Sequence, residues 1–203
     1  FALLPALLYA GIPPTRQSDA SQRMTKDIMD RVYITPKRIV TKYAGCKNNL
    51  IKDEHYLLER GNGQSEMNRK KCCIMTSTET EKASLLLDFG SELHGGLKVV
   101  MGSSSRREPS LVRIRFGESV GEANSTTSNS EWKVGFSTDD HAKRDIIMEI
   151  PRDGMIEIGN TGFRFVRLDL LQNNATISLK EISAILRYRD IPYLGSFECN
   201  DQR

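Results

Sequence analysis

Pairs of carboxylates are the first feature of this 203-residue chain that could carry out chemistry. Glu118 and Glu122 form one pair, and Asp139 and Asp140 form another. Hydrolysis of a glycosidic bond needs two such groups, about 5 Å apart for retention or roughly 6.5–9.5 Å apart for inversion. Both pairs lie in polar sequence that is typical of surface loops, and no neighbouring pattern favours a protonated carboxyl group. We therefore expect no complete catalytic site in this chain.

Trp132 is the only tryptophan, and it lies in a long polar insertion over residues 117–141. A sugar ring can stack on an indole, so Trp132 is a candidate platform for carbohydrate. The alternative is that Trp132 fixes the insertion to the body of the domain. Glu118 lies at the start of the same insertion, and an insertion of this length is usually functional or disordered. Trp132 and Glu118 are therefore the two residues that we predict to bind substrate.

Other residue types that could support catalysis or ligand binding lack the required context. Ser103–Ser105 follow a glycine, but the second glycine of a nucleophile elbow is missing. The glycines of the segment FGSELHGG are not followed by the Lys-Ser/Thr pair of a phosphate loop. His55, His94 and His141 are far apart, and no spacing of cysteines and histidines is typical of a zinc site. We predict no metal site and no cofactor.

Charge and cysteine content limit the class of protein. The net charge of +3 is too small to predict nucleic-acid binding without a concentrated basic patch. Four cysteines in 203 residues do not make a disulfide scaffold. Adjacent Cys72 and Cys73 would point to opposite faces of a strand, so one could be buried and the other could pair with Cys46. The sequence leaves the pairing open, and Cys199 adds a further alternative.

The first ten residues, FALLPALLYA, carry no charge and end in the small residue Ala10. They are too short to span a bilayer, which needs about 20 residues, but they fit the end of a signal peptide. The alternative is a buried strand or a short helix. We interpret residues 1–10 as a signal-peptide remnant. This predicts a secreted or periplasmic protein whose mature chain begins near Gly11 and has no membrane span.

Alternating apolar and polar residues dominate the chain from Cys72 onward. In the clearest segment, 111–116, Ile114 and its neighbours two residues away would face a core, while Arg113 and Arg115 would face solvent. Similar segments recur at 84–89, 97–101, 146–150, 166–170 and 177–188. At least seven strands at this spacing predict an all-β, antiparallel, jelly-roll-like sandwich over 72–190. Residues 11–71 are expected to form an irregular arm with edge strands.

Three local features of the predicted strands carry further expectations. Gly90, Gly95 and Gly96 are expected to form a tight connection between two strands, with positive φ. The alternation of the last strand changes phase near Glu181-Ile182, which predicts a β-bulge. On the strand around 166–170, Arg164 and Arg167 are expected to pair with a cross-strand acid such as Asp169 or Glu157.

Several segments, in this order, resemble the sandwich region of bacterial α-L-rhamnosidases, which form glycoside hydrolase family 78. They are LLLDFGSELHGGLKVV at 85–100, RIRFGESVGEA at 113–123 and TGFRFVRLDLL at 161–171. RDIPYLGSFECNDQR at 189–203 resembles the crossing into the catalytic domain of those enzymes. The resemblance covers residues 84–203.

The resemblance implies a downstream (α/α)6 barrel that hydrolyses terminal α-L-rhamnosides with inversion and that holds both catalytic carboxylates. Residues 191–203 would then be the linker into that barrel, which would be the partner of the sandwich in the same protein. On this basis the chain is a non-catalytic, accessory part of the enzyme, and no catalytic residue is assigned to it. One alternative function is a lectin-like carbohydrate-binding module. Another is a structural piece that self-associates through exposed strand edges.

Overall fold

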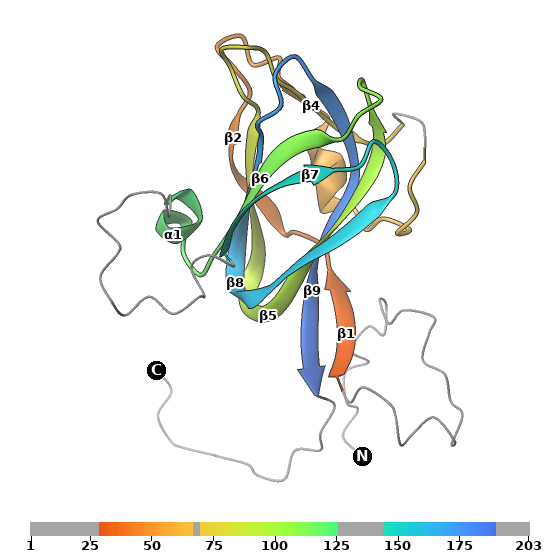
Figure 1. Ribbon diagram of the computed structural model, residues 1–203. Helices are drawn as coiled ribbons and strands as arrows, with labels where there is room; N and C mark the ends of the chain where they lie inside the picture. The colour runs from red at the N-terminus through yellow and green to blue at the C-terminus, as the bar shows by residue number, and fades with distance from the viewer. Residues whose placement is uncertain (1–28, 67–69, 126–143, 190–203) are drawn as a thin grey trace.

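The computed structural model describes residues 29–66, 70–125 and 144–189. Figure 1 shows an all-β antiparallel sandwich with very little helix, which confirms the predicted fold class. The helix α1 spans Val120–Asn124, and the 3-10 helix η2 spans Glu54–Leu58. The strands are β1 (Met29–Ile34), β2 (Arg38–Tyr43), β3 (Ile51–Lys52), β4 (Cys73–Thr76), β5 (Ser84–Ser104), β6 (Ser110–Gly117), β7 (Asp145–Ile150), β8 (Met155–Leu170) and β9 (Thr176–Arg189).

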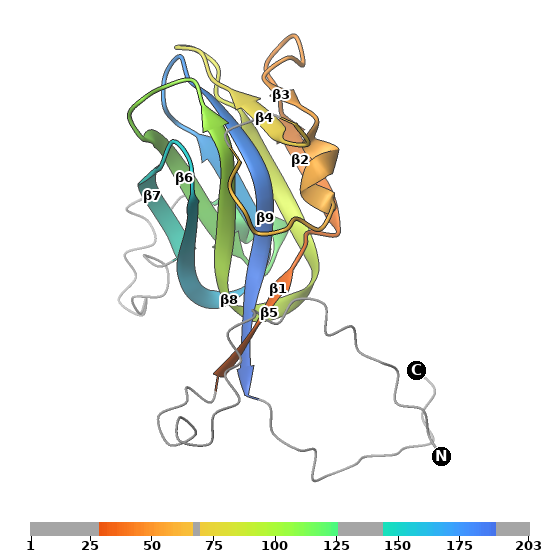
Figure 2. The ribbon, with the colours of Figure 1, turned by 90° about the vertical axis from the view of Figure 1, so that its right-hand side faces the viewer.

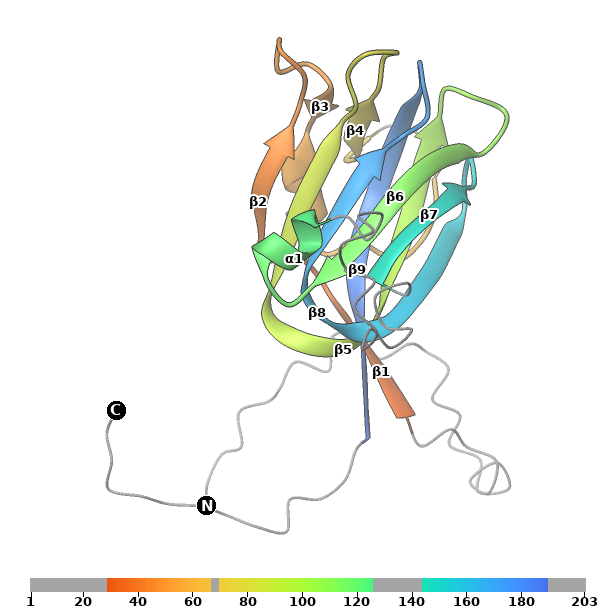
Figure 3. The ribbon, with the colours of Figure 1, turned by 60° about the vertical axis from the view of Figure 1, so that its left-hand side comes forward.

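Two long strands, β5 and β8, run through both layers of the sandwich (Figures 2 and 3). The first part of β5, 84–88, lies between β2 and the end of β8. The end of β8 also pairs with β6, and β6 pairs with β7. These strands make layer one. The last part of β5, 95–104, pairs with β9, which also pairs with β1 and β4. These strands, with β3 and the start of β8, make layer two.

Glycine permits the bend of β5 between the two layers. Gly90 and Gly95 have φ values of +89° and +154°. A Cβ atom on Gly95 would lie 1.7 Å from the carbonyl oxygen of Ile185 in β9, so any side chain there would collide with the neighbouring backbone. The predicted positive φ is confirmed at these two glycines and is wrong for Gly96, which is not among the glycines with positive φ. The predicted connection between two strands is wrong, because residues 84–104 form one continuous bent strand.

The core lies between the layers around three phenylalanine rings. Phe163 packs edge-on against Phe89 and Phe116, with ring centroids 5.9 Å and 4.9 Å apart. Ile114 is fully buried, as the alternation of its strand predicts. Arg115 differs from the expectation: it points away from the core but is only 5% exposed, because α1 and its flanking backbone cover it.

The described part of residues 11–71 contributes β1, β2 and β3, each of which pairs with one strand of the sandwich. The boundary between arm and sandwich stays a prediction, and residues 1–10 and 191–203 lie outside the described residues. β1 and β9 form a two-stranded ribbon that extends beyond the body, with Met29 opposite Arg189 (Figure 1). In the described ranges, no helix has the length and apolar character needed to cross a membrane.

The predicted bulge in the last strand is confirmed. Val100 of β5 lies opposite Glu181, but the next residue, Met101, lies opposite Leu179. Lys180 is therefore the extra residue, and it shifts the side chains that follow it to the other face of β9. The shift lets both halves of β9 direct apolar side chains to the same core.

Ile114→Ala should lower the free energy of unfolding by about 2–5 kcal/mol, because it leaves a cavity in a fully packed core. Met155→Ala is the matched control, since Met155 is 54% exposed and should change stability by less than about 0.5 kcal/mol. Urea denaturation followed by circular dichroism measures both values. A loss below about 0.5 kcal/mol for Ile114→Ala would contradict the assigned core face.

Candidate functional site

Glu118 lies where β6 ends and the chain turns into α1. Its carboxylate accepts a hydrogen bond from Nη2 of Arg144 at 3.0 Å, and the Glu122 carboxylate accepts one from Nη1 of the same residue. Burial acts to lower the pKa of Arg144, but its hydrogen bond with Glu118 and the charge of Glu122 raise the pKa above its usual value. The structure thus gathers the predicted carboxylate pair around one permanently charged guanidinium.

Glu92 and Gly162 extend this cluster at the bend of β5. A Cβ atom on Gly162 would lie 3.6 Å from Oε1 of Glu118 and 3.9 Å from Oε1 of Glu92, so both carboxylates approach the same piece of backbone. His94 lies opposite Gly162 in the β5–β8 register and is exposed. We call the set Glu92, His94, Glu118, Glu122, Arg144 and Gly162 the Glu118 surface. It offers hydrogen-bond acceptors and a charged donor within one exposed area.

Ser119 is the N-cap of the helix that carries Glu122, and the Glu122 carboxylate reaches back to the preceding backbone, in an arrangement close to a capping box. Oγ of Ser119 accepts a hydrogen bond from the Glu122 amide at 3.1 Å, and the Glu122 carboxylate accepts one from the Glu118 amide at 2.8 Å. At the other end, Ala123 is fully buried against Leu86 and Phe165. The start of the predicted polar insertion thus contains a short helix that was not predicted from the sequence. The Ser-x-x-Glu spacing at 119–122 is the sequence signal that would have identified this helix.

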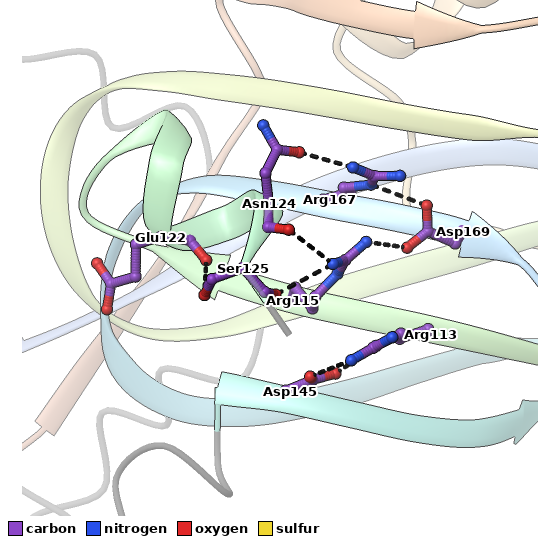
Figure 4. A network of polar contacts seen from close by, with 8 residues as sticks. All are labelled: Arg113, Arg115, Glu122, Asn124, Ser125, Asp145, Arg167 and Asp169. Atoms are coloured by element: carbon purple, nitrogen blue, oxygen red, sulfur yellow. Dashed lines mark hydrogen bonds and ion pairs between the residues drawn. The ribbon is translucent and has the colours of Figure 1, made fainter. Parts of the chain in front are cut away.

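A polar network fixes the end of α1 to the outer face of layer one (Figure 4). Arg115 donates to Oδ2 of Asp169 at 2.6 Å and to the carbonyl oxygens of Asn124 and Ser125, each at 3.1 Å. Arg167 donates to Oδ1 of Asp169 at 2.8 Å and to Oδ1 of Asn124 at 2.7 Å. Arg167 does pair with Asp169, as predicted, but the two residues lie on the same strand, β8, so the expected cross-strand geometry is wrong for this pair. The network gives the last helical carbonyl groups charged donors, which stabilises so short a helix.

Polar contacts fix the described residues on both sides of the segment 126–143. Arg115 holds Ser125, which precedes the segment, and Arg144 contacts Glu118 and Glu122 where the described chain resumes. The next residue, Asp145, accepts a hydrogen bond from Nε of Arg113 at 2.7 Å (Figure 4). The predicted residues Trp132, Asp139, Asp140 and His141 lie in this segment, outside the described residues. The two described residues that flank the segment therefore lie at the Glu118 surface, since Ser125 contacts Glu122 and Arg144 contacts Glu118.

Asp88 is a buried carboxylate at the bend of β5, and no sequence motif identified it. It is 2% exposed and accepts hydrogen bonds from Nε and Nη2 of Arg164 at 2.8 Å and 3.0 Å. The Arg38 side chain donates at 2.9 Å and the Gly90 amide at 2.7 Å. The bonds from Arg164 outweigh burial and, with those from Gly90 and Arg38, hold the Asp88 pKa well below its usual range.

Arg164 pairs with a cross-strand acid, as the sequence predicts, but the acid is Asp88 of β5 and neither Asp169 nor Glu157. The bend of β5 places Asp88 beside Arg164. Glu157 accepts hydrogen bonds from Arg31 at 2.9 Å and from Tyr33 at 2.7 Å instead. Both acids are thus bound by residues that are distant in sequence, and local alternation cannot identify such partners.

Cysteine and histidine form no ligand cluster in the described chain, where no group of three or more His, Cys, Asp and Glu side chains could hold a metal ion. Within the described residues, Cys46 forms no disulfide with Cys72 or Cys73. Cys46 is exposed, whereas Cys72 and Cys73 are both buried. Burial raises the pKa of the Cys73 thiol to about 12. Cys199 lies outside the described residues.

No protein-family model and no curated protein matches this chain. Among solved structures, a rhamnosidase from Klebsiella oxytoca with rhamnose bound is similar with a TM-score of 0.51 and 15% identity. The match covers 78% of this chain and 29% of the enzyme. The two share a fold. The chain thus spans less than a third of that rhamnosidase.

Other similar structures are more distant. A family 78 glycoside hydrolase rhamnosidase of a Bacillus species matches with a TM-score of 0.45 and 16% identity, over 65% of this chain and 13% of the other. A fucose-binding module of Streptococcus pneumoniae matches with a TM-score of 0.42 and 9% identity, over 74% of this chain and 93% of the other. The neighbours of this sandwich therefore include parts of large glycoside hydrolases and separate carbohydrate-binding modules.

Asp88→Asn should lower the free energy of unfolding at pH 7 by roughly 1.5–3 kcal/mol, because two arginines lose a charged acceptor. The folded-state pKa of Asp88 is depressed, so its ionised form stabilises the fold above the unfolded-state pKa of about 3.9. The difference between wild type and variant should therefore shrink as the pH falls below about 4. Thermal denaturation from pH 2.5 to pH 7 tests this.

Asp153→Asn is the control for this measurement, because Asp153 is exposed in the turn between β7 and β8. It should change stability little at any pH in the same range. A deficit of Asp88→Asn that is equally large at pH 2.5 and pH 7 would contradict the depressed pKa.

Proposed function

We propose that this chain is the non-catalytic, sugar-binding sandwich of a larger glycoside hydrolase. The observation that carries the proposal is the position of the Glu118 surface, at both ends of the segment that contains Trp132. The fold shared with a rhamnosidase that was solved with rhamnose bound gives independent support. The binding face would combine Glu118, Arg144 and Trp132.

The chemistry of the Glu118 surface suits a polyhydroxylated ligand. Carboxylate oxygens of Glu92 and Glu118 can accept hydrogen bonds from neighbouring hydroxyl groups, and the guanidinium of Arg144 can donate to a ring or hydroxyl oxygen. Gly162 leaves its backbone uncovered between the two carboxylates, so a ring could approach closely. An indole supplied by Trp132 would contact the apolar face of the sugar. A few directed polar groups beside one aromatic side chain are typical of small-ligand sites.

The same geometry argues against hydrolysis by the sandwich. An inverting mechanism needs one carboxyl group that protonates the leaving oxygen and a second that activates water across the sugar. Glu118 and Glu122 instead bind one guanidinium, which draws both carboxylates to the same side.

We further propose that the parent protein is an α-L-rhamnosidase of glycoside hydrolase family 78. A barrel following residues 191–203 would then supply both catalytic carboxylates. The resemblance of residues 84–203 and the likeness over 29% of a rhamnosidase support this parent. The uncharged residues 1–10 support secretion to the periplasm or the exterior. A lectin-like module without a hydrolase is the alternative, and the coding sequence downstream of Arg203 separates the two.

The purified chain should bind a deoxyhexose such as L-rhamnose or L-fucose weakly, with a dissociation constant on the order of 1 mM. Titration of an isotope-labelled sample followed by NMR measures binding across a panel of monosaccharides. Trp132→Ala and Glu118→Gln should each weaken binding at least about tenfold, which corresponds to about 1.4 kcal/mol. Glu149→Gln, an exposed carboxylate on β7, is the control and should bind as wild type does. Unchanged binding by both site variants would rule out this face.

The chain alone should not release rhamnose from an aryl α-L-rhamnoside. Glu118→Gln with Glu122→Gln provides the background rate, because it removes the predicted carboxylate pair that the structure gathers around Arg144. The same protein extended through its downstream coding region should release rhamnose. Release by the short chain above the rate of the double variant would show that the sandwich itself is catalytic.

A further inference from the structure

The free edges of the sandwich differ in their protection against pairing with another strand. β2, at one edge of layer one, has a register shift between Ile39 and Thr41 and carries Arg38 and Lys42. The first half of β8, at an edge of layer two, is interrupted by Gly159 with φ of +87°. Bulges, irregular backbone and basic side chains are the devices by which natural sheets block edge-to-edge association.

The remaining edges of layer two are protected as well. β3 is two residues long, and η2 begins shortly after it. β1 carries the charged residues Asp30 and Arg31 in its first half, and Arg31 is bound by Glu157. A short strand and a charged strand both give a poor template for a further strand.

β7, the other edge of layer one, has no bulge, no irregular backbone and no basic side chain, and its only charged residues are the acids Asp145 and Glu149. Its six residues, DIIMEI, contain no glycine, proline or lysine, and they pair with β6 without a register shift. Among the described residues, β6 is the only strand that pairs with β7. Ile147 is 57% exposed and Glu149 is also exposed. Ile146 and Met148 face the core but are only partly buried. β7 is thus a regular edge strand with apolar side chains on both faces.

We propose that β7 pairs antiparallel with β7 of a second copy of this chain, about a two-fold axis at Ile147. The sequence of the strand is symmetric in chemistry about this residue. Ile146 on one side matches Met148 on the other, and Asp145 matches Glu149. In an antiparallel pair centred on Ile147, apolar Ile146 therefore meets the partner's apolar Met148 twice, once on each side of the axis, and Ile147 meets its own copy.

The contacts in this pairing are favourable on both faces of the sheet. Ile147 would pack against its own copy on the outer face, which removes an exposed apolar side chain from water. Ile146 would lie opposite the partner's Met148, so the pair would close the open edge of the core. Both side chains are only partly buried in a single chain.

Charge also permits this register. Glu149 would lie opposite the partner's Asp145, and two adjacent carboxylates would normally repel. Each Asp145, however, is bound by Arg113 of its own chain through Nε at 2.7 Å, and its side chain is 6% exposed. The neighbouring guanidinium offsets the aspartate charge and attracts the incoming Glu149. Two such contacts form, one on each side of the axis.

The first test is sedimentation velocity over a range of protein concentrations without sugar. The full chain should show a monomer that converts to a dimer as concentration rises. Ile147→Lys should weaken dimerisation at least about tenfold, because it introduces a charge at the axis. Met155→Lys is the matched control, since Met155 is 54% exposed but lies outside β7, and it should dimerise as wild type does. Circular dichroism shows that each variant is folded.

The second test fixes the register. In a Cys46→Ser, Cys199→Ser background, Ile147→Cys should form a disulfide-linked dimer on oxidation, because directly opposed Cβ atoms lie about 4.5–5.5 Å apart. Glu149→Cys, two residues along the same face, should not. A chain that stays monomeric at all concentrations, an undiminished dimer of Ile147→Lys, or cross-linking through Glu149→Cys alone would overturn the proposal. None of these outcomes depends on sugar binding.

Discussion

The close approach of two backbones at Gly95 sets the architecture of this sandwich. Because Gly95 has no side chain, β5 can turn against the carbonyl oxygen of Ile185 and continue from one layer into the other. β8 follows β5 through the same change of direction, so the two layers are joined by paired strands rather than by loops. The core aromatic residues Phe89 and Phe163 lie on these two strands. Packing of the core and joining of the layers are thus consequences of the same bend.

The ion pairs on the outer face of layer one also depend on the bend of β5. Asp88, at the bend, gathers Arg38 and Arg164, and the adjacent outer face of layer one carries the network around Asp169. That network holds a five-residue helix that is too short to be stable in isolation. The helix in turn presents Glu122 to Arg144. The Glu118 surface is therefore positioned by buried ion pairs on a rigid sheet rather than by the helix itself.

Alternation of apolar and polar residues was sufficient to predict strands and the burial of Ile114. Successive side chains of a strand point to opposite faces, and here one face is buried and the other faces solvent. Alternation did not predict that the two halves of β5 form one strand. Their continuity depends on the contact of Gly95 with β9, a strand that is distant in the sequence. The partners of Arg164 and Glu157 were missed for the same reason, since Asp88 and Arg31 come beside them only after the layers fold. The helix at Ser119 was different: a local capping pattern was present in the sequence and was overlooked. Of the predicted site, Glu118 could be placed, whereas the position of Trp132 stays a prediction.

The ribbon of β1 and β9 has a mechanical consequence. Because Met29 lies opposite Arg189 at its tip, the two strands lead out of the body side by side. Tension applied at these two residues would break the backbone hydrogen bonds between β1 and β9 one after another. It would not load all of these hydrogen bonds at the same time. The ribbon would therefore open at low force and lengthen the connection while the double-layered body stayed folded.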